Sequence, residues 1–201
     1  MMPIITISRE TGSNGSRIGE MVAKELNIPV IDKYFIEELR KKTGYSPSHL
    51  ENKGEYLSQF DFFLNAQFYN GLYLGDEQND LYHIQRNIIL EEAKKGPCVI
   101  IGRCADAILA DEKIPSLNVF IHADMEYRIR NYRERFPNHE ATLEKLMKKK
   151  DKGRKAYYRF YTDREWGDVS NYDLALDSGR LGEEMCKKLI IVAAQERAEI
   201  K

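Results

Sequence analysis

The chain has 201 residues, of which 42% are hydrophobic, and its 31 Lys and Arg residues against 32 Asp and Glu residues give a formal net charge of −1 at pH 7. This composition excludes a collagen, a disordered tail and a disulfide-rich miniprotein, and it favours one domain with a sizeable core. The balanced charge argues against nucleic acid or a membrane as a partner.

Targeting signals and cysteine use bear on where the protein works. No apolar run approaches the length of a membrane span, and the N-terminus has no basic region followed by an apolar stretch. We therefore expect a soluble, cytoplasmic protein. The cysteines Cys98, Cys104 and Cys186 are too few and too scattered for a disulfide framework or a zinc site, so we expect reduced, mostly buried thiols.

The predicted elements, taken along the chain, alternate between short β-branched runs and longer segments of helical period. That alternation is typical of an α/β protein with a parallel sheet wrapped by helices. The predicted strands are residues 4–7, 29–31, 98–102 and 117–121, with a short fifth strand at 174–176. Helices are expected after the first two strands and at residues 182–198. In that last helix we expect Met185, Leu189 and Val192 to form the buried face, widened by Ile190 and Ala193.

An aromatic-rich segment lies between the second and third predicted strands. Seven of the chain's aromatic residues fall between Tyr56 and Tyr73. We expect residues 51–95 to form two helices broken near 71–75, with these rings in the core or in a dimer interface. Stacking of one ring on a nucleobase is the alternative.

Charge is concentrated in a later segment. Between Glu126 and Arg159 there are twelve Lys and Arg residues against five Asp and Glu, a surplus of +7 that leaves −8 on the rest of the chain. The segment should be helical on either side of residues 136–138 and should meet negative charge. In its first helix, the predicted buried stripe comprises Met125, Ile129, Tyr132 and Phe136. Arg128 and Arg135 would border that stripe on one side and Arg133 on the other.

The second basic helix brings four side chains onto one face. Asp151, Arg154, Tyr158 and Tyr161 follow at spacings of three, seven and ten residues. Asp151 can hold Arg154 in place beneath two ring hydroxyls, which suits a phosphate or the edge of a base. The alternative is an ordinary exposed ion pair.

A polar, glycine-containing loop, residues 8–17, joins the first strand to its helix. Gly12, Asn14 and Gly15 can adopt positive φ, so that backbone N–H groups converge on one anion at the helix N-terminus. This pattern predicts a phosphate cradle, and an ordinary tight turn is the alternative.

Compared with the Walker pattern G-x-x-x-x-G-K-[ST], the loop departs at three positions. Arg9 replaces the first glycine, Asn14 the second, and Gly15 the lysine that reaches the transferring phosphate. The missing charge could come from Arg9, Arg17 or Arg103. Ser16 could still offer its hydroxyl to Mg²⁺.

Open α/β sheets bind ligands at the carboxyl ends of their strands, where Asp32 and residues 103–106 are expected. Asp32 could accept from a ribose hydroxyl or order Mg²⁺ through water, or it could only cap its helix. Arg103 could hold an acceptor phosphate in bidentate fashion.

These motifs together resemble the cytidylate kinase-like family. The resemblance rests on Ser8-Arg9-Glu10-x-Gly12-Ser13-x-Gly15, Ile31-Asp32-Lys33, Gly102-Arg103-Cys104-Ala105-Asp106, Asp151-x-x-Arg154-x-x-Tyr157-Tyr158, Trp166-Gly167-Asp168 and Asn171-Tyr172-Asp173. It runs nearly end to end, and the family's usual loop also lacks the Walker lysine. It implies a P-loop kinase fold: a five-stranded parallel sheet of order 2-3-1-4-5 between helical layers. The 1–201 domain would carry a helical insertion (about 44–95) on the acceptor side and a basic lid region (about 124–165).

The resemblance also implies a function, the transfer of the γ-phosphoryl group of ATP to CMP or dCMP with Mg²⁺. The candidate residues for the donor phosphates are Arg9, Gly12, Ser13, Asn14, Gly15, Ser16 (also the Mg²⁺ candidate) and Arg17. The candidates for the acceptor are Asp32, Arg103, Asp106 and Tyr158. Arg128 and Arg154, the latter held by Asp151, are the candidate catalytic residues. A nucleotide sensor without turnover and a kinase for a non-nucleotide small molecule are the alternatives. The expected partners are small-molecule nucleotides, with a homodimer possible through the insertion.

Overall fold

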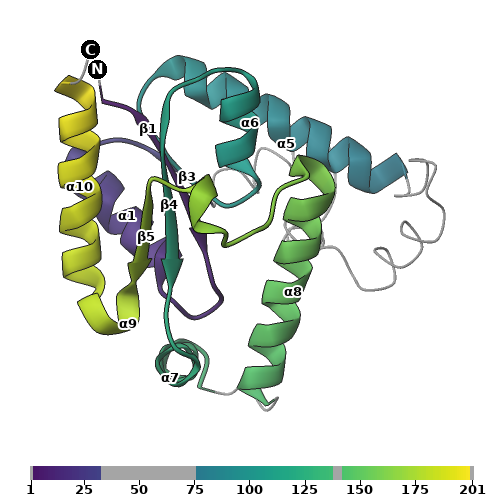
Figure 1. The fold of residues 1–201 in the computed structure, drawn as a ribbon, viewed down its shortest axis with the longest axis vertical. Helices are drawn as coiled ribbons and strands as arrows, with labels where there is room; N and C mark the ends of the chain where they lie inside the picture. The colour runs from purple at the N-terminus through teal and green to yellow at the C-terminus, as the bar shows by residue number, and fades with distance from the viewer. Residues whose placement is uncertain (1, 33–75, 138–141, 200–201) are drawn as a thin grey trace.

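The computed structural model describes residues 2–32, 76–137 and 142–199, and in them it places a five-stranded parallel sheet (Figure 1). The strand order is β2-β3-β1-β4-β5, which confirms the predicted fold. The strands are β1 (Ile4–Arg9), β2 (Val30–Ile31), β3 (Val99–Ile101), β4 (Ser116–His122) and β5 (Leu174–Asp177). The central strand β1 pairs with β3 on one side and β4 on the other, with Ile5 opposite both Val99 and Leu117.

Helices cover both faces of the sheet and make three layers (Figure 1). One face carries α1 (Gly15–Leu26) and α10 (Glu183–Glu199), and the other carries α5 (Asp76–Lys95), α6 (Ala105–Asp111) and α8 (Leu143–Thr162). Side chains along a strand alternate between faces, so Ile5 and Ile7 pack in the α1–α10 cluster while Ile4 packs in the other cluster. Both faces are therefore buried, as a parallel sheet requires.

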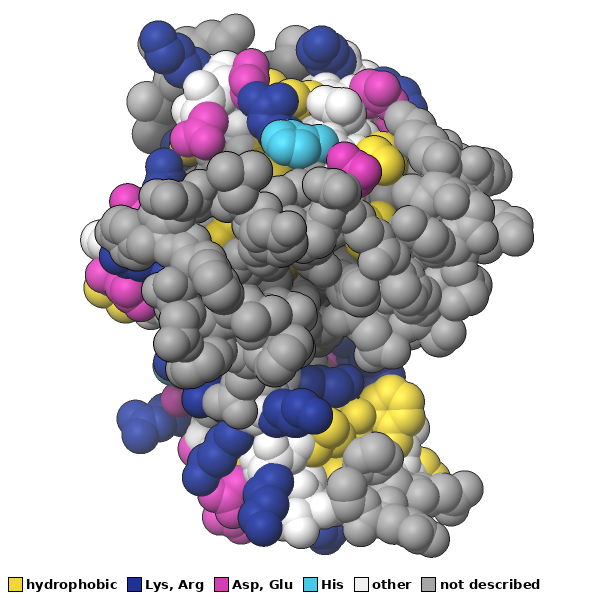
Figure 2. Space-filling model, turned by 90° about the vertical axis from the view of Figure 1, so that its right-hand side faces the viewer, with side chains coloured by type: hydrophobic (Ala, Val, Ile, Leu, Met, Phe, Trp, Pro, Cys, Tyr) yellow, Lys and Arg dark blue, Asp and Glu magenta, His cyan; other side chains and the backbone are white. Residues whose placement is uncertain are grey.

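Three further elements complete the described part of the chain. They are α7 (Met125–Arg135), a 3₁₀ turn η1 (Val169–Asn171) and α9 (Ser178–Leu181). The predicted pair of basic helices corresponds to α7 and α8. Figure 2 looks onto the side where α8 lies and shows Lys and Arg side chains gathered toward the lower part of the molecule.

The strand order determines where a ligand can bind. The chain leaves β1 toward the β2 side of the sheet and leaves β3 toward the β4 side. A crevice therefore opens outside the carboxyl ends of β1 and β3, which is where open α/β sheets bind ligands.

The expectation for the last helix was wrong about its main buried stripe and right about Ile190. Met185, Leu189 and Val192 are 46%, 38% and 54% exposed, whereas Ile190 is fully buried together with Cys186 and Ala194. Because α10 is apolar on both sides, a helical period fits either face. The small side chains of Cys186 and Ala194 allow the helix to pack closely on α1 and the sheet.

The predicted buried stripe of α7 was also wrong. Arg128 is the one α7 residue that is fully buried, while Met125, Ile129 and Tyr132 are only partly buried and Phe136 is 45% exposed. α7 leaves the end of β4 and packs against the loop and α8 instead of a face of the sheet (Figure 1). Its inward side therefore carries a paired cation and not an apolar stripe.

Some expectations lie outside the described residues. These are the helix after β2 and the aromatic residues between Tyr56 and Tyr73, while the second predicted helix of that segment corresponds to α5. All three cysteines are buried and free, as predicted. Among the helices described, none combines the length and the apolar character that crossing a bilayer demands.

Candidate active site

The loop between β1 and α1 has the backbone geometry of an anion cradle. Gly12 and Asn14 both have positive φ, 85° and 59°, and α1 begins immediately afterwards at Gly15. The fully buried Ser13 donates its hydroxyl to the Glu10 carbonyl at 2.9 Å, which fixes its side chain inward. The first N–H groups of α1 have no partner within the helix, so they are available to a phosphate.

The loop is anchored from behind by the chain that follows β5. Ser178 donates its hydroxyl to the Ser13 carbonyl at 2.7 Å. The Glu183 carboxylate, at the start of α10, accepts from Asn14 Nδ2 at 2.7 Å and pairs with Arg17 Nε at 2.9 Å. Arg17 is thus held at Glu183, and its side chain is 67% exposed.

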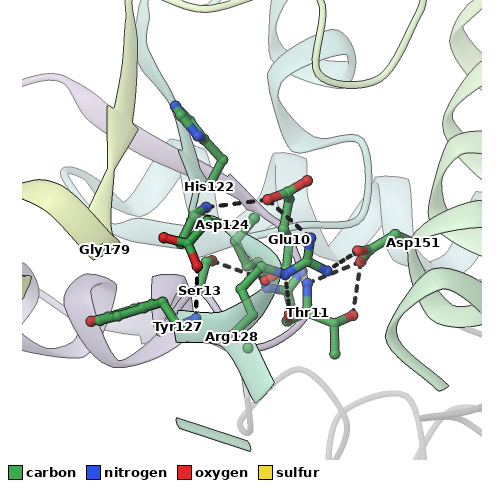
Figure 3. A network of polar contacts seen from close by, with 12 residues as sticks. Glu10, Thr11, Ser13, His122, Asp124, Tyr127, Arg128, Asp151 and Gly179 are labelled. Atoms are coloured by element: carbon green, nitrogen blue, oxygen red, sulfur yellow. Dashed lines mark hydrogen bonds and ion pairs between the residues drawn. The ribbon is translucent and has the colours of Figure 1, made fainter. Parts of the chain in front are cut away.

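A buried network of charges ties α7 and α8 to the same loop (Figure 3). Arg128, whose side chain is 5% exposed, donates Nε–H to the Thr11 carbonyl at 2.7 Å. Its guanidinium also pairs with Asp151 and, at 3.2 Å, with Glu10. Asp151 accepts in turn from the Thr11 N–H at 2.9 Å and the Thr11 hydroxyl at 2.8 Å. A buried arginine is stabilised here by two carboxylates and a carbonyl.

Arg154 joins this network one turn further along α8. Its Nη1 lies 3.2 Å from Asp151, 2.8 Å from the Thr11 hydroxyl and 3.3 Å from the Arg9 carbonyl. The Asp151–Arg154 contact is the one that the spacing in the sequence predicts. Arg154 therefore lies over the start of the loop.

Three arginines from different elements line one small hollow. The lining residues are Ser8, Arg9, Gly102, Arg103, Cys104, Arg154, Tyr157, Tyr158 and Trp166. The hollow lies in the crevice at the ends of β1 and β3, and its volume of about 20 Å³ is close to that of one water molecule. A nucleotide would enter only if side chains at this position moved.

The backbone at the end of β3 has an uncommon conformation. Gly102, Arg103 and Cys104 have φ of 72°, 60° and 55°, three left-handed residues in succession. A left-handed conformation costs roughly 1–2 kcal/mol for each residue other than glycine. Such strained positions cluster at functional sites, and here the turn carries Arg103, which is 7% exposed, to the hollow.

Tyr158, which lines the hollow, is hydrogen-bonded to a buried carboxylic acid, Asp106. Tyr158 donates its hydroxyl to Asp106 Oδ2 at 2.7 Å, and Asp106 is 2% exposed. Burial raises the pKa of the Asp106 carboxyl above its ordinary value, opposed by the hydrogen bond from Tyr158. Burial and the neighbouring Asp106 raise the pKa of Tyr158 as well, so its hydroxyl stays protonated as a donor.

Comparison with known proteins identifies the family to which the chain belongs. The family model described as "Cytidylate kinase-like family" matches residues 4–180. The chain belongs to the cytidylate kinase-like family. A protein named cytidylate kinase from Methanococcus vannielii is 25% identical over 182 residues, which cover 89% of this chain and 92% of that protein.

Solved structures agree with the fold. An uncharacterized protein from Eubacterium ventriosum is 28% identical, has a TM-score of 0.72, and is matched over 97% of this chain and 99% of its own. A shikimate kinase from Bacteroides thetaiotaomicron is 14% identical with a TM-score of 0.56 over the whole of both chains. At that identity the second likeness shows the P-loop kinase fold alone.

Within this family member, the predicted residues divide into four groups. Those that line the hollow are Arg9, Arg103, Arg154 and Tyr158. Arg128 and Asp151 lie in the buried network beside it, and residues 12–16 form the end of the loop and the first turn of α1. Asp32, Asp106 and Arg17 do not line the hollow: Asp32 follows the edge strand β2, and Asp106 lies behind Tyr158. The roles of all these residues in ligand binding stay predictions.

The sequence reasoning gave no role to Glu10 or Thr11, both of which hold the network together. Their signal in the sequence was weak, because a loop residue that binds a helix 140 positions away leaves no periodic pattern. Tyr161, expected above the Asp151–Arg154 pair, instead stacks on Tyr82 of α5 with ring centroids 3.9 Å apart.

The residues near the loop fit an Mg²⁺ that arrives with a nucleotide. The Ser16 hydroxyl, in the first turn of α1, is approached by Arg9 Nε at 3.3 Å, which is a long hydrogen bond. No cluster of three or more His, Cys, Asp or Glu side chains suited to a metal occurs within residues 2–32, 76–137 and 142–199. Mg²⁺ commonly takes one or two protein ligands together with phosphate oxygens and water, so one hydroxyl is compatible with it.

Proposed function

We propose that this protein transfers the γ-phosphoryl group of ATP to a nucleoside monophosphate, with CMP or dCMP as the acceptor. The observation that carries the proposal is the convergence of Arg9, Arg103 and Arg154 on one hollow beside the loop. Family membership and the P-loop kinase fold support a kinase. The name of the Methanococcus relative supports the choice of acceptor.

In the proposed reaction, the acceptor phosphate oxygen attacks the γ-phosphorus of ATP. The bond from that phosphorus to the bridging oxygen breaks, and ADP leaves with the electron pair. Negative charge accumulates around the moving group, so fixed guanidinium groups in a site without water supply most of the acceleration. Arg154 would stabilise the moving group, Arg103 would hold the acceptor phosphate, and the N–H groups of residues 14–16 would hold the donor.

Mg²⁺ would be held by the Ser16 hydroxyl and the nucleotide phosphates. It supplies charge neutralisation on the β- and γ-phosphates when it is bound. On this chain, Arg9 is the neighbour that would keep the Ser16 hydroxyl oriented toward that position.

The test is a panel of acceptors mixed with the protein, ATP and Mg²⁺, with ADP formation measured for each. We expect the fastest turnover with CMP or dCMP, slower turnover with UMP and AMP, and no rate above that of ATP alone with shikimate or gluconate. Fast turnover with shikimate or gluconate would show that the acceptor is not a nucleotide. If the protein binds ATP but forms ADP in none of the mixtures, it is a nucleotide sensor and not a kinase.

The sensor is the second candidate, and one contact favours it. The Asp151 carboxylate already accepts the Thr11 N–H, so a loop donor and the charge of Arg154 are both satisfied by an internal anion. If a nucleotide phosphate displaced this carboxylate, α8 would shift, and the protein could report nucleotide binding without transferring a phosphoryl group. The same panel distinguishes the two candidates, because only the kinase consumes ATP.

A further inference from the structure

Two departures of the loop from the Walker pattern are reciprocal. The pattern begins with a glycine and places a lysine six positions later, whereas this chain has Arg9 at the first position and Gly15 at the later one. Arg9 is the last residue of β1, and Gly15 is the first residue of α1. The cation and the glycine have exchanged positions.

The two positions compete for the same space. A Cβ atom on Gly15 would lie 2.4 Å from Arg9 Cβ and 2.9 Å from Arg9 Cγ, with Ile121 Cβ at 3.2 Å. These atoms are the stem of the arginine, which cannot swing away as the end of a flexible side chain can. No side chain fits at position 15 while any residue with a Cβ stands at position 9.

The Arg9 side chain also points to the place where the charge is needed. Its Nε lies 3.3 Å from the Ser16 hydroxyl, in the first turn of α1. It lines the hollow together with Arg103 and Arg154. Arg17, the other arginine next to the loop, is held at Glu183 and does not line that hollow.

We propose that Arg9 is a catalytic residue that supplies, from the end of β1, the positive charge that a Walker lysine supplies from the start of α1. Gly15 is glycine because the arginine stem fills the lysine's position. This inference rests on the proposed function, since its ligand is the β- and γ-phosphates of the donor nucleotide. The planar guanidinium can contact two phosphate oxygens at once, which a lysine ammonium does not do.

The exchange can be reversed by mutation. We would prepare Arg9→Gly, Gly15→Lys and the double variant, and measure the affinity of each for ADP and for a non-hydrolysable ATP analogue by calorimetry, alongside its melting temperature. Arg9→Gly should weaken binding of the ATP analogue by about tenfold or more, the scale of one lost charge-assisted hydrogen bond. Gly15→Lys alone should lower the melting temperature.

The double variant decides the proposal. With both Arg9 and its Cβ gone, Ile121 Cβ at 3.2 Å is the one close contact left of the three for a lysine at position 15. The double variant should therefore regain most of the melting temperature lost by Gly15→Lys and recover at least part of the lost affinity. A folded double variant that binds the ATP analogue no better than Arg9→Gly would overturn the proposal. Arg197→Ala, which removes a cation at the far end of α10, is the control and should leave the affinity unchanged.

A second comparison does not depend on the double variant folding. Arg9→Met keeps the stem and loses the charge, so it should lose affinity for the ATP analogue by about tenfold. Arg9→Lys keeps the stem and the charge but not the contact with two oxygens, so its loss of affinity should be smaller than that of Arg9→Met. Equal affinities for Arg9→Met and the parent would overturn the role of Arg9 while leaving the kinase proposal intact. Failure of the unmodified protein to bind either nucleotide would overturn both.

Discussion

The arrangement of this site depends on a few charged side chains that are buried together with their hydrogen-bond partners. Arg128 is buried because two carboxylates and a carbonyl surround it, and Asp106 is buried because Tyr158 donates to it. The sequence predicted that these residues take part in the site but not how each is buried. Helical periodicity reports where apolar side chains recur, and it carries no information on which cation finds buried partners.

The Asp106 carboxyl should make stability depend on pH. Burial raises its pKa above the ordinary value of 3.8, so between that value and the higher pKa of the folded state the folded protein binds a proton that the unfolded chain releases. The free energy of unfolding then falls as pH rises, by up to about 1.4 kcal/mol per pH unit. Asp106→Asn should remove this slope, which urea unfolding of both proteins from pH 4 to pH 8 would measure.

A companion variant tests the cause of that slope. Tyr158→Phe removes the hydrogen bond that lowers the pKa of Asp106, so the decline in stability should extend to higher pH than in the parent. Parallel stability curves for the parent and Asp106→Asn would show that the Asp106 carboxyl titrates alike in the folded and unfolded chain.

At the scale of elements, the strands and the loop were predictable, and the buried faces of α7 and α10 were not. Strands β1, β3 and β4 each contain a short run rich in β-branched and other apolar residues, because both of their faces are buried, so their sequence alone identifies them. For α7 and α10 the buried face depends on neighbours that are distant in the sequence. α7 lies against the loop and α8, and α10 is apolar on two sides, so periodicity chose the wrong face in both helices.

Close approach between the loop and α7 predicts a specific sensitivity at Gly12. A Cβ at Gly12 would lie 2.6 Å from the Arg128 carbonyl oxygen, and its φ is +85°. Gly12→Ala should therefore incur both the left-handed backbone cost of roughly 1–2 kcal/mol and a further clash of about 1–3 kcal/mol. Urea unfolding measures the sum.

Asn27 provides the control, because it ends α1 in the left-handed region, with φ 52° and ψ 45°. The difference in stability between Asn27→Gly and Asn27→Ala should show the backbone cost alone. If Gly12→Ala loses no more stability than this difference, the contact of the loop with α7 does not restrict position 12.

At the scale of the whole molecule, the site combines three parts that are distant in the sequence: the loop after β1, the end of β3 and the side of α8. The class and strand order were predictable because alternating strands and helices restrict a chain to few topologies, and the family motifs select among these. The contact between Asp151 and Thr11 was not predictable, since it joins residues 140 positions apart.

Arg154 connects these parts, and replacing it tests the account most directly. The measurement is the rate of CDP formation from ATP, Mg²⁺ and CMP, followed by ³¹P NMR for the parent and for Arg154→Ala. Arg159→Ala, a half-exposed arginine on the same helix, serves as the control. The account predicts that Arg154→Ala is slower by about two to four orders of magnitude, the scale of arginine contributions to phosphoryl transfer, and that Arg159→Ala is not. An Arg154→Ala variant that forms CDP as fast as the parent would contradict it.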